Sequence, residues 1–371
     1  YSLILIFSMM YPLAIGLLIQ PERTLEDGNS VDDWLFTDVP DEISQSTTWT
    51  EEESPYYANS SVSMAQGETL TIEQGVVVYM GIGASLDILG ATLDVRGTAE
   101  DPVTFAPRPD LGSESTWNGI FVNTELGGED HPASVSLENT VIEGAIRGID
   151  ANPGDFTAPT LSVTVYNSVF SNNGCGIKAS DAASVSVQNS YFINSPVCSE
   201  NSMPTPAEIS ISDSTFIGSN ITWHSGHVER NLIVPLQISN PPPIEIYGYL
   251  ENPPNDRFRW NCVDNANHLF FQNDHEEENL AVVSNNTFFR STFTLDPDGG
   301  MKPAEFHGNN FLQTSDQALM LEDDHAYLTE NWWGTTSTSQ IDEMIYDYND
   351  DGPAGDAFYL PILTSQRDFP C

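Results

Sequence analysis

The sequence has little positive charge. It holds 11 lysines and arginines against 54 aspartates and glutamates, and its lysines are Lys178 and Lys302. A formal net charge of -43 repels nucleic-acid phosphates, which excludes nucleic acid as a partner. The 54 acidic residues are distributed along the whole 371-residue chain and are not concentrated in a tail. This distribution is typical of a protein adapted to seawater or brine, where salt screens the repulsion between its own charges.

Long hydrophobic runs are also scarce, and the exception lies at the start. Residues 2–19 carry no charge. Such a run exceeds the roughly 7 to 15 apolar residues of a signal peptide and approaches the roughly 20 that span a bilayer. We therefore expect export, with residues 1–20 forming a hydrophobic helix that is either a cleaved signal peptide or a membrane anchor. Residues 21–60 are rich in Glu, Asp, Ser and Thr and predict a disordered acidic linker.

An internal repeat is the most informative feature of the sequence. Seven segments of eight residues share one pattern of alternating apolar and polar residues. Their starts lie 22 to 28 residues apart, except for one interval of 72 residues that is close to three periods of 24. This period is too short for a propeller blade and lacks the consensus of a leucine-rich repeat, so it predicts one coil of a parallel β-helix per repeat. The segments start at Val135, Val163, Val185, Ile209, Ala281, Ala304 and Ala326.

Two positions of the repeat carry structural information. The eighth residue is aromatic in six of the seven segments, and we expect these rings to form one inner file. The fifth residue is mostly Asn or Asp, which tolerates the left-handed backbone of a turn and can bond its copy in the next coil. We therefore expect an inward ladder, although exposed turn residues would show the same pattern. Its members are Asn139, Asn167, Asn189, Asp213 and Asn285.

Upstream of the repeat, short strands continue between Gly and Pro turns. Residues 67–78 read G-x-x-L-x-I-x-x-G-V-x-V, and residues 331–334 read N-W-W-G. With these motifs the chain resembles the secreted right-handed parallel β-helix repeat proteins of pectate-lyase-like fold. The resemblance implies an all-β, single-stranded, right-handed parallel β-helix, a solenoid, over residues 61–335. It also implies that residues 336–371 form a cap and tail, in which a short helix from Ser337 covers the apolar end of the last coil.

The four cysteines show no C-x-x-C spacing. In an exported chain they predict disulfides in preference to metal ligands. Cys175 and Cys198 fall at nearly the same position of neighbouring coils, which lie about 4.8 Å apart, so we expect them to be bonded. Cys262 and Cys371 are then left to each other or free.

An acidic run near the end of the chain is a candidate metal site. Asp347, Asn349 and Asp351 match the first half of a calcium loop, in which alternate oxygens bind one cation. The second half of the calcium-loop motif does not match, because Phe358 occupies the position of the bidentate Glu. Calcium is therefore a candidate cofactor beside the alternative of a solvated linker, and no cofactor is required.

A less regular stretch, rich in Pro and aromatic residues, supplies candidates for carbohydrate contact. They are Tyr247, Arg257, Arg259 and Trp260. Aromatic faces stack on sugar rings, and loops on a rigid scaffold often carry binding residues. Burial of the aromatic side chains in the core explains the pattern equally well.

Catalytic residues are not identifiable from the sequence. A lyase of this fold needs a Lys or Arg base, but the Arg-x-Lys pair of pectinolytic relatives has no counterpart, and Asp150 and Lys178 predict an ordinary exposed ion pair. A glycosidase needs two carboxyls about 5 to 10 Å apart. The chain has so many carboxyl groups that the sequence does not identify one such pair. We predict an extracellular, surface-anchored protein that binds polysaccharide or a cell-surface component, or serves as a structural or adhesive stalk. A polysaccharide lyase or glycoside hydrolase is the alternative, and whether the protein is an enzyme stays open.

Overall fold

In the computed structural model the chain divides into two compact units, Tyr1–Phe36 and Thr37–Cys371. The structure describes residues 36–111, 116–126, 129–154, 160–200, 206–236, 244–249, 257–272, 282–295, 305–313, 318–321, 326–347, 350 and 356–368. The predicted N-terminal hydrophobic helix lies outside these residues. Among the residues that are described, no helix is long and apolar enough to cross a bilayer.

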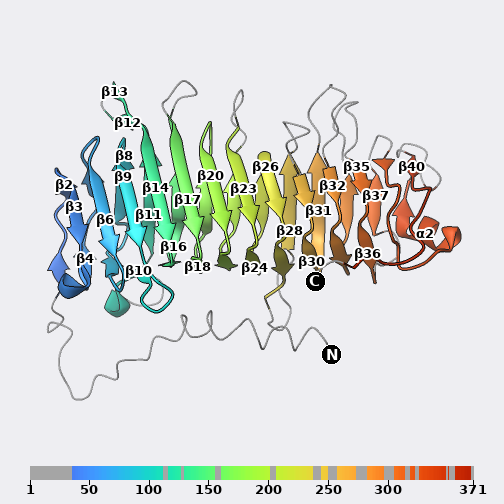
Figure 1. Ribbon diagram of the computed structural model, residues 1–371, viewed down its shortest axis with the longest axis horizontal. Helices are drawn as coiled ribbons and strands as arrows, with labels where there is room; N and C mark the ends of the chain where they lie inside the picture. Colours follow the sequence, from blue (N-terminus) through green and yellow to red (C-terminus); the bar gives the residue numbers. More distant parts are fainter. Residues whose placement is uncertain are drawn as a thin grey trace, which may run out of the picture. The chain divides into compact units, whose positions relative to one another are not determined.

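The second unit is a parallel β-helix, in which each coil gives one short strand to each of three sheets, here called A, B and C (Figure 1). Sheet A contains β1 (Thr37–Asp38), β4 (Tyr56–Ala58), β7 (Val77–Met80), β10 (Val103–Pro107), β15 (Thr140–Glu143), β18 (Val169–Ser171), β21 (Tyr191–Ile193), β24 (Thr215–Ile217), β27 (Leu232–Val234), β30 (Cys262–Asp264), β33 (Thr287–Phe289) and β36 (Asn310–Leu312). Sheet B contains β2 (Glu42–Ile43), β5 (Val62–Met64), β8 (Ser85–Leu89), β11 (Trp117–Asn123), β16 (Ala145–Ala151), β19 (Cys175–Ala179), β22 (Val197–Ser199), β25 (Ile221–Trp223), β28 (Ile244–Tyr249), β31 (Ala266–Gln272), β34 (Phe293–Leu295), β37 (Leu319–Leu321) and β39 (Ile345–Tyr346). Sheet C contains β3 (Thr47–Trp49), β6 (Thr69–Glu73), β9 (Thr92–Arg96), β14 (Ala133–Glu138), β17 (Leu161–Tyr166), β20 (Ser184–Gln188), β23 (Glu208–Ser212), β26 (Ser225–Glu229), β29 (Arg257–Arg259), β32 (Val282–Ser284), β35 (Glu305–His307), β38 (Ala326–Tyr327) and β40 (Ala357–Phe358). A separate antiparallel hairpin of β12 (Glu125–Leu126) and β13 (Glu129–Asp130) interrupts the coil between β11 and β14.

Apolar side chains alternate into one continuous core. In β17 every second residue is buried and those between are exposed, as expected for a strand with one face in a core. The predicted aromatic file is confirmed in sheet A. Phe170, Phe192 and Phe216 are register partners whose ring centroids lie 4.9 and 4.7 Å apart. Phe288 and Phe311 continue the file with a separation of 5.6 Å.

The β-helix begins at Thr37, so the prediction of a linker over residues 21–60 is wrong from that point on. Strands β1 to β4 lie within the region and join the three sheets. Trp49 and Tyr56 are buried there and stack with centroids 4.8 Å apart. These strands are two or three residues long, too short to give the alternation by which a strand is recognised in a sequence.

The turn from sheet C to sheet A contains a ladder, but the predicted inward orientation is wrong. Asn139, Asn167, Asn189, Asp213 and Asn285 have the expected left-handed backbone, with φ between 46° and 58°, yet their side chains are partly or fully exposed. The residue that follows each of these five is the one that points inward. These inward residues form the inner ladder, in which each side chain accepts a hydrogen bond from the backbone N–H of the member one coil earlier, beginning with Thr140. The accepting members are Ser168, Ser190, Ser214, Asn231, Asn261, Asn286, Asn309 and Asn331.

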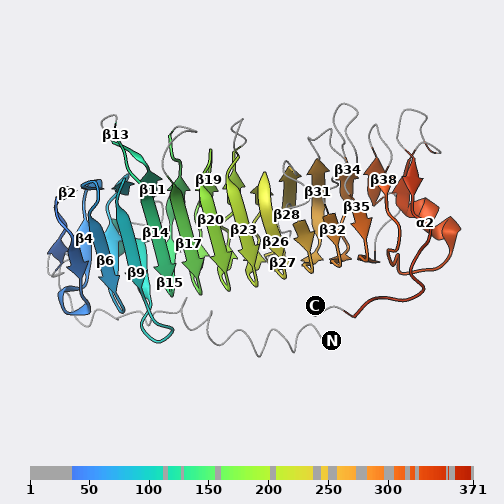
Figure 2. The same ribbon diagram turned by 45° about the horizontal axis from the view of Figure 1, so that its top comes forward.

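The C-terminal residues close the last coil. The predicted helix is confirmed as α2 (Thr338–Met344), which follows Ser337 and buries Ile341. Strands β39 and β40 then extend sheets B and C, so the segment after residue 335 is a further partial coil as well as a cap. Beyond it the chain runs back along the β-helix (Figure 2), where the backbone of Arg367 exchanges two hydrogen bonds of 3.0 Å with the Asn310 side chain.

Candidate functional site

A row of outward-facing side chains crosses four strands of sheet B. Asp87 of β8 pairs in register with Phe121 of β11, Phe121 with Asp150 of β16, and Asp150 with Lys178 of β19. The chain neighbours of all four residues are buried in the core, so these side chains point away from it. Paired strands lie about 4.8 Å apart, which sets the four side chains in one line. An aromatic ring thus lies between two carboxyls, with a cation beside them.

A β-bulge brings a second cation to this face. The register between β11 and β16 shifts after Gly119, so that Gly148 has no partner in β11. Arg147 and Asp150, three residues apart, consequently both point outward. A side chain at position 119 is excluded, because a Cβ there would come within 1.5 Å of the carbonyl oxygen of Arg147. The two glycines therefore hold Arg147 beside the row.

Three members of the row, Asp87, Phe121 and Asp150, line an open groove of about 550 Å³ on the outer face of sheet B. Carboxyl, amide, guanidinium and aromatic groups line it together, so the groove offers hydrogen-bond donors, acceptors and one apolar surface. The side chains that matter here are Asp87, Asn118, Phe121, Asn123, Arg147 and Asp150.

The two groove carboxyls have unequal surroundings. Asp150 is only 5% exposed, and its Oδ2 accepts a hydrogen bond of 2.6 Å from Arg147 Nη1. Its Oδ1 is buried and has no hydrogen-bond partner in the described part of the chain. Asp87 is half-buried, and this burial raises the pKa of its carboxyl, while a hydrogen bond from Ser85 acts in the opposite direction.

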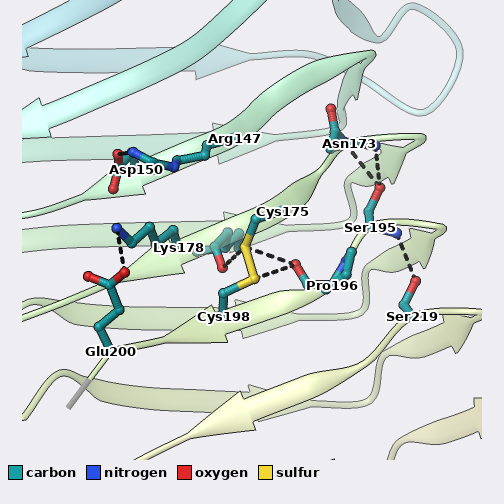
Figure 3. Close-up of a disulfide and its surroundings, with 11 residues drawn as sticks. Arg147, Asp150, Asn173, Cys175, Lys178, Ser195, Pro196, Cys198, Glu200 and Ser219 are labelled. Atoms are coloured by element: carbon teal, nitrogen blue, oxygen red, sulfur yellow. Dashed lines mark hydrogen bonds and ion pairs between the residues drawn. A yellow bond between two sulfur atoms is a disulfide. The ribbon is translucent and has the colours of Figure 1, made fainter. Parts of the chain in front are cut away.

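The predicted pairing of Asp150 with Lys178 is half right. The two residues are neighbours in register, as expected. Each pairs with a different partner, however: Asp150 with Arg147, and Lys178 with Glu200 at 2.8 Å (Figure 3). Both cations next to the groove are therefore already engaged by carboxylates.

A disulfide borders the site. The predicted bond between Cys175 and Cys198 is confirmed, with Cα atoms 6.4 Å apart, and it joins β19 to β22 (Figure 3). In sheet B, Cys198 pairs in register with Lys178, so the bond crosses the sheet diagonally. Cys262 is disulfide-bonded as well, whereas Cys371 lies outside the described residues.

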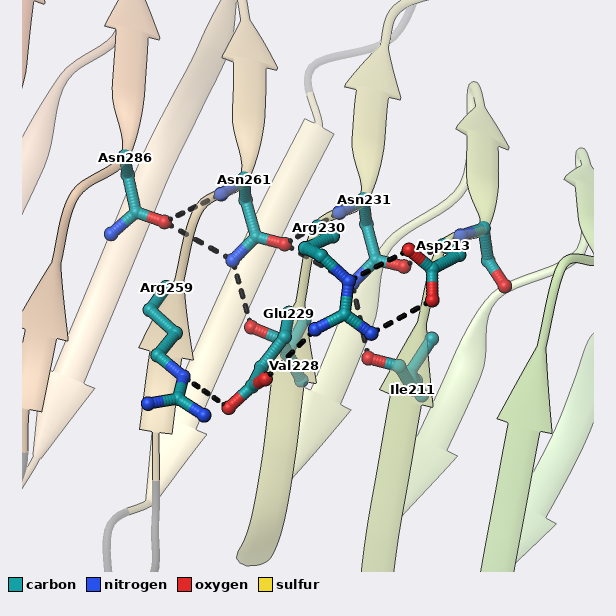
Figure 4. A network of polar contacts seen from close by, with 10 residues as sticks. Ile211, Asp213, Val228, Glu229, Arg230, Asn231, Arg259, Asn261 and Asn286 are labelled. Carbon is teal, nitrogen blue, oxygen red and sulfur yellow. Dashed lines mark hydrogen bonds and ion pairs between the residues drawn. The ribbon is translucent and has the colours of Figure 1, made fainter. Parts of the chain in front are cut away.

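The structure does not bring the four predicted carbohydrate-contact residues together. Tyr247 lies on β28 in sheet B, whereas Arg257 and Arg259 lie on β29 in sheet C and Trp260 in the turn that follows. The Arg259 guanidinium lies 4.3 Å from the centroid of the Trp260 ring, and it also pairs with Glu229 (Figure 4). Contact of these residues with carbohydrate stays a prediction.

The predicted calcium ligands are described only in part. Asp347 is buried, and its Oδ2 accepts a hydrogen bond of 3.3 Å from the backbone N–H of Ala357. Asn349 and Asp351 lie outside the described residues. Across the residues that are described, no three His, Cys, Asp or Glu side chains gather as a metal site would require. Calcium binding stays a prediction.

Asp87 and Phe121, which complete the groove, were not among the residues predicted from the sequence. Their strands precede the seven matched segments, and the β12–β13 hairpin lengthens the coil that links them to the regular repeat. The sequence signal that could have identified them is the alternation of apolar and other residues in β8 and β11, in which Asp87 and Phe121 each lie between two apolar neighbours.

Comparisons with known proteins add little to this geometry. No protein-family model matches the sequence, and no curated protein matches it. Among solved structures, a mannuronic-acid-specific polysaccharide family 6 lyase from human gut microbiota aligns with 85% of this chain and 91% of its own, at 11% identity and a TM-score of 0.25. A score this low carries no argument about the site, and the parallel β-helix stands on the strand register described above.

Proposed function

We propose that this protein binds an extracellular polysaccharide in the groove on sheet B. The observation that carries the proposal is Phe121, a partly exposed ring set in one row between Asp87 and Asp150. Sugars present apolar ring faces beside hydroxyl edges, so an aromatic face flanked by carboxyl and amide groups suits them. The amides of Asn118 and Asn123 supply donors beside the carboxyl acceptors.

The rigidity of the support favours binding of a long polymer. Asp87, Phe121 and Asp150 stand on three adjacent strands of one sheet, so the spacing of the side chains is fixed by the coil repeat. A groove that follows the repeat offers successive contacts to a repeating chain. We place the protein at the cell surface, because residues 1–20 form an uncharged run that serves as an export signal or an anchor.

Affinity electrophoresis of the full chain tests the proposal. In gels containing neutral polysaccharides, we expect one polymer to retard the protein and Phe121→Ala to weaken that binding about three- to tenfold. Tyr166→Ala is the matched control, since Tyr166 is an exposed aromatic residue on β17 of sheet C and lies outside the groove.

Two outcomes would contradict the groove. Equal loss of binding in both variants would place the polysaccharide elsewhere on the β-helix. Absence of retardation by every polymer, with both variants folded by circular dichroism, would favour the alternative of a structural or adhesive stalk.

A further inference from the structure

Three tripeptides of the form N-x-S/T are not accounted for by the groove. They are residues 59–61, 220–222 and 285–287. In an exported protein such a tripeptide is the acceptor for an N-linked glycan, but many matches arise by chance. The surroundings of the three tripeptides in the fold decide between them.

The tripeptide at residues 220–222 is built into sheet B. Ile221, its middle residue, begins β25 and is fully buried in the core. Asn220 Oδ1 accepts a hydrogen bond of 3.0 Å from the backbone N–H of Glu245 in the next coil. An enzyme that modifies Asn220 has to bind the backbone around it, which requires this strand to leave the sheet. Asn220 is therefore closed to modification in the folded chain.

The tripeptide at residues 285–287 is held in a similar way. Asn286 belongs to the inner ladder and is fully buried, and Thr287 is only 8% exposed. Asn285 Oδ1 accepts a hydrogen bond of 3.2 Å from Arg367 Nη1 in the C-terminal segment. The second and third residues of this tripeptide are thus out of reach of a modifying enzyme.

The tripeptide at residues 59–61 differs from both. It forms the corner between β4 and β5, outside the strands, and all three of its residues are exposed. Tyr57 Oη donates a hydrogen bond of 2.8 Å to Asn59 Oδ1, which holds the oxygen side of the amide. No described residue accepts a hydrogen bond from Asn59 Nδ2. The nitrogen to which a glycan attaches is therefore not committed to the fold.

We propose that Asn59 carries an N-linked glycan. This inference rests on export of the chain, because the donor, a sugar linked through phosphate to a membrane lipid, serves proteins that leave the cytoplasm. Asn59 Nδ2 forms a bond to the anomeric carbon of the sugar while the bond from that carbon to the phosphate oxygen breaks. The phosphate leaves on the lipid, and Nδ2 gives up one proton to a base of the transferase. The exposed hydroxyl of Ser61 completes the acceptor.

Peptide mapping by mass spectrometry of the full chain, isolated from its source organism, tests the proposal. We expect the peptide with Asn59 to exceed its sequence mass by one glycan, and the peptides with Asn220 and Asn285 to keep their sequence mass. Ser61→Ala removes the acceptor hydroxyl and should reduce the modified fraction to background. Ser60→Ala is the matched control: it makes the same change at the middle position, where any residue except proline is accepted, and should leave that fraction unchanged.

An unmodified Asn59 in the exported chain would overturn the proposal. A glycan on Asn220 or Asn285 of the folded protein would refute the argument from exposure, and equal loss in both serine variants would show that the modification does not use the tripeptide. Asn59 does not line the groove on sheet B. The Phe121→Ala experiment therefore tests the proposed function separately, whatever the state of Asn59.

Discussion

The inner ladder is serine in the earlier coils of the β-helix and asparagine in the later ones. The serine members are Ser168, Ser190 and Ser214, and asparagine takes over from Asn231 onward. Ser190 is representative of the first group: its Oγ accepts from the backbone N–H of Ser168 and donates to the carbonyl of Gln188 in its own turn. Each serine therefore makes one hydrogen bond between coils and one within its turn.

Asparagine makes more bonds between coils. Asn261 Oδ1 accepts from the backbone N–H of Asn231, and its Nδ2 donates to the carbonyl of Val228 and to the side chain of Asn286 (Figure 4). Asn286 and Asn309 repeat the arrangement. The later coils are thus linked through their side chains to the coil before and the coil after.

The two halves also differ in their aromatic file and coil length, although each contains a disulfide-bonded cysteine, Cys175 in the first and Cys262 in the second. In the serine half, three phenylalanine rings stack without a gap, and a disulfide joins β19 to β22. In the asparagine half, Ile233 and Val263 interrupt the aromatic file, and the register of Ile209 with Gly226 gives a coil shorter than the repeat. Side-chain hydrogen bonds therefore link the coils where the aromatic file of sheet A is interrupted and the coil length is irregular, although other ring contacts, such as Trp223 with Phe258, continue aromatic stacking there.

The largest effect that tests this difference is expected at the ladder itself. Asn261→Ala removes the side-chain hydrogen bonds to Asn231, Val228 and Asn286, and it leaves the buried backbone N–H of Asn231 without an acceptor. We expect this change to lower the free energy of unfolding by about 4 kcal/mol. Ser190→Ala should lower it by about 2 kcal/mol, because one cross-coil bond is lost. Urea denaturation followed by circular dichroism measures both.

Gln188→Ala serves as the control, since Gln188 is exposed on β20 and should change stability by less than about 0.5 kcal/mol. Equal losses for Asn261→Ala and Ser190→Ala would show that the additional bonds of asparagine do not strengthen the later coils.

The next effect concerns the serine half. Replacing Cys175 and Cys198 with serine opens a loop of sequence separation 23 in the unfolded chain, which should lower the free energy of unfolding by about 3 kcal/mol. Thermal melting of the wild type and the double variant measures the difference. A melting temperature that does not change would show that the stacked rings hold this half without the disulfide.

The fold was predictable because the repeat fixes where large side chains lie. The eighth residue is phenylalanine in five of the seven segments, and a large apolar side chain that recurs at one position of the coil has to share one face of one sheet, as Phe170, Phe192 and Phe216 do. The first coil was missed because strands such as Thr37–Asp38 are too short to show a period. The ladder was placed one residue early, because composition shows that Asn139 favours a left-handed turn but not which neighbour the turn directs inward.

The groove was less predictable than the fold. Register on regular coils placed Asp150 beside Lys178 correctly. The ion pair of Asp150 with Arg147 depends on a bulge at Gly148, and a bulge appears in a sequence only as one more glycine. Asp87 joins the row across a coil lengthened by a hairpin, so counting residues from the regular repeat does not reach it.

The smallest effect is expected at the point where serine gives way to asparagine. Arg230, just before Asn231, donates to both carboxylate oxygens of Asp213 at 2.7 and 2.8 Å, and these hydrogen bonds lower the pKa of Asp213 (Figure 4). Because the folded pKa is depressed, the stabilisation is present above the usual aspartate pKa and is lost as pH falls through the folded value. Both side chains are substantially exposed, so solvent screening limits the contribution to about 0.5 kcal/mol.

Arg230→Gln tests this last contribution. The variant should lower the free energy of unfolding by about 0.5 kcal/mol at pH 7 in low salt, and the difference from the wild type should vanish near pH 2 or in molar salt. Urea denaturation at the two pH values, in low and high salt, provides the measurement. A loss that persists at pH 2 would mean that Arg230 acts through the left-handed turn it occupies, at φ 56°, and through its contact with Glu229. In that case the junction between the two halves would be held by backbone conformation and packing instead of by charge.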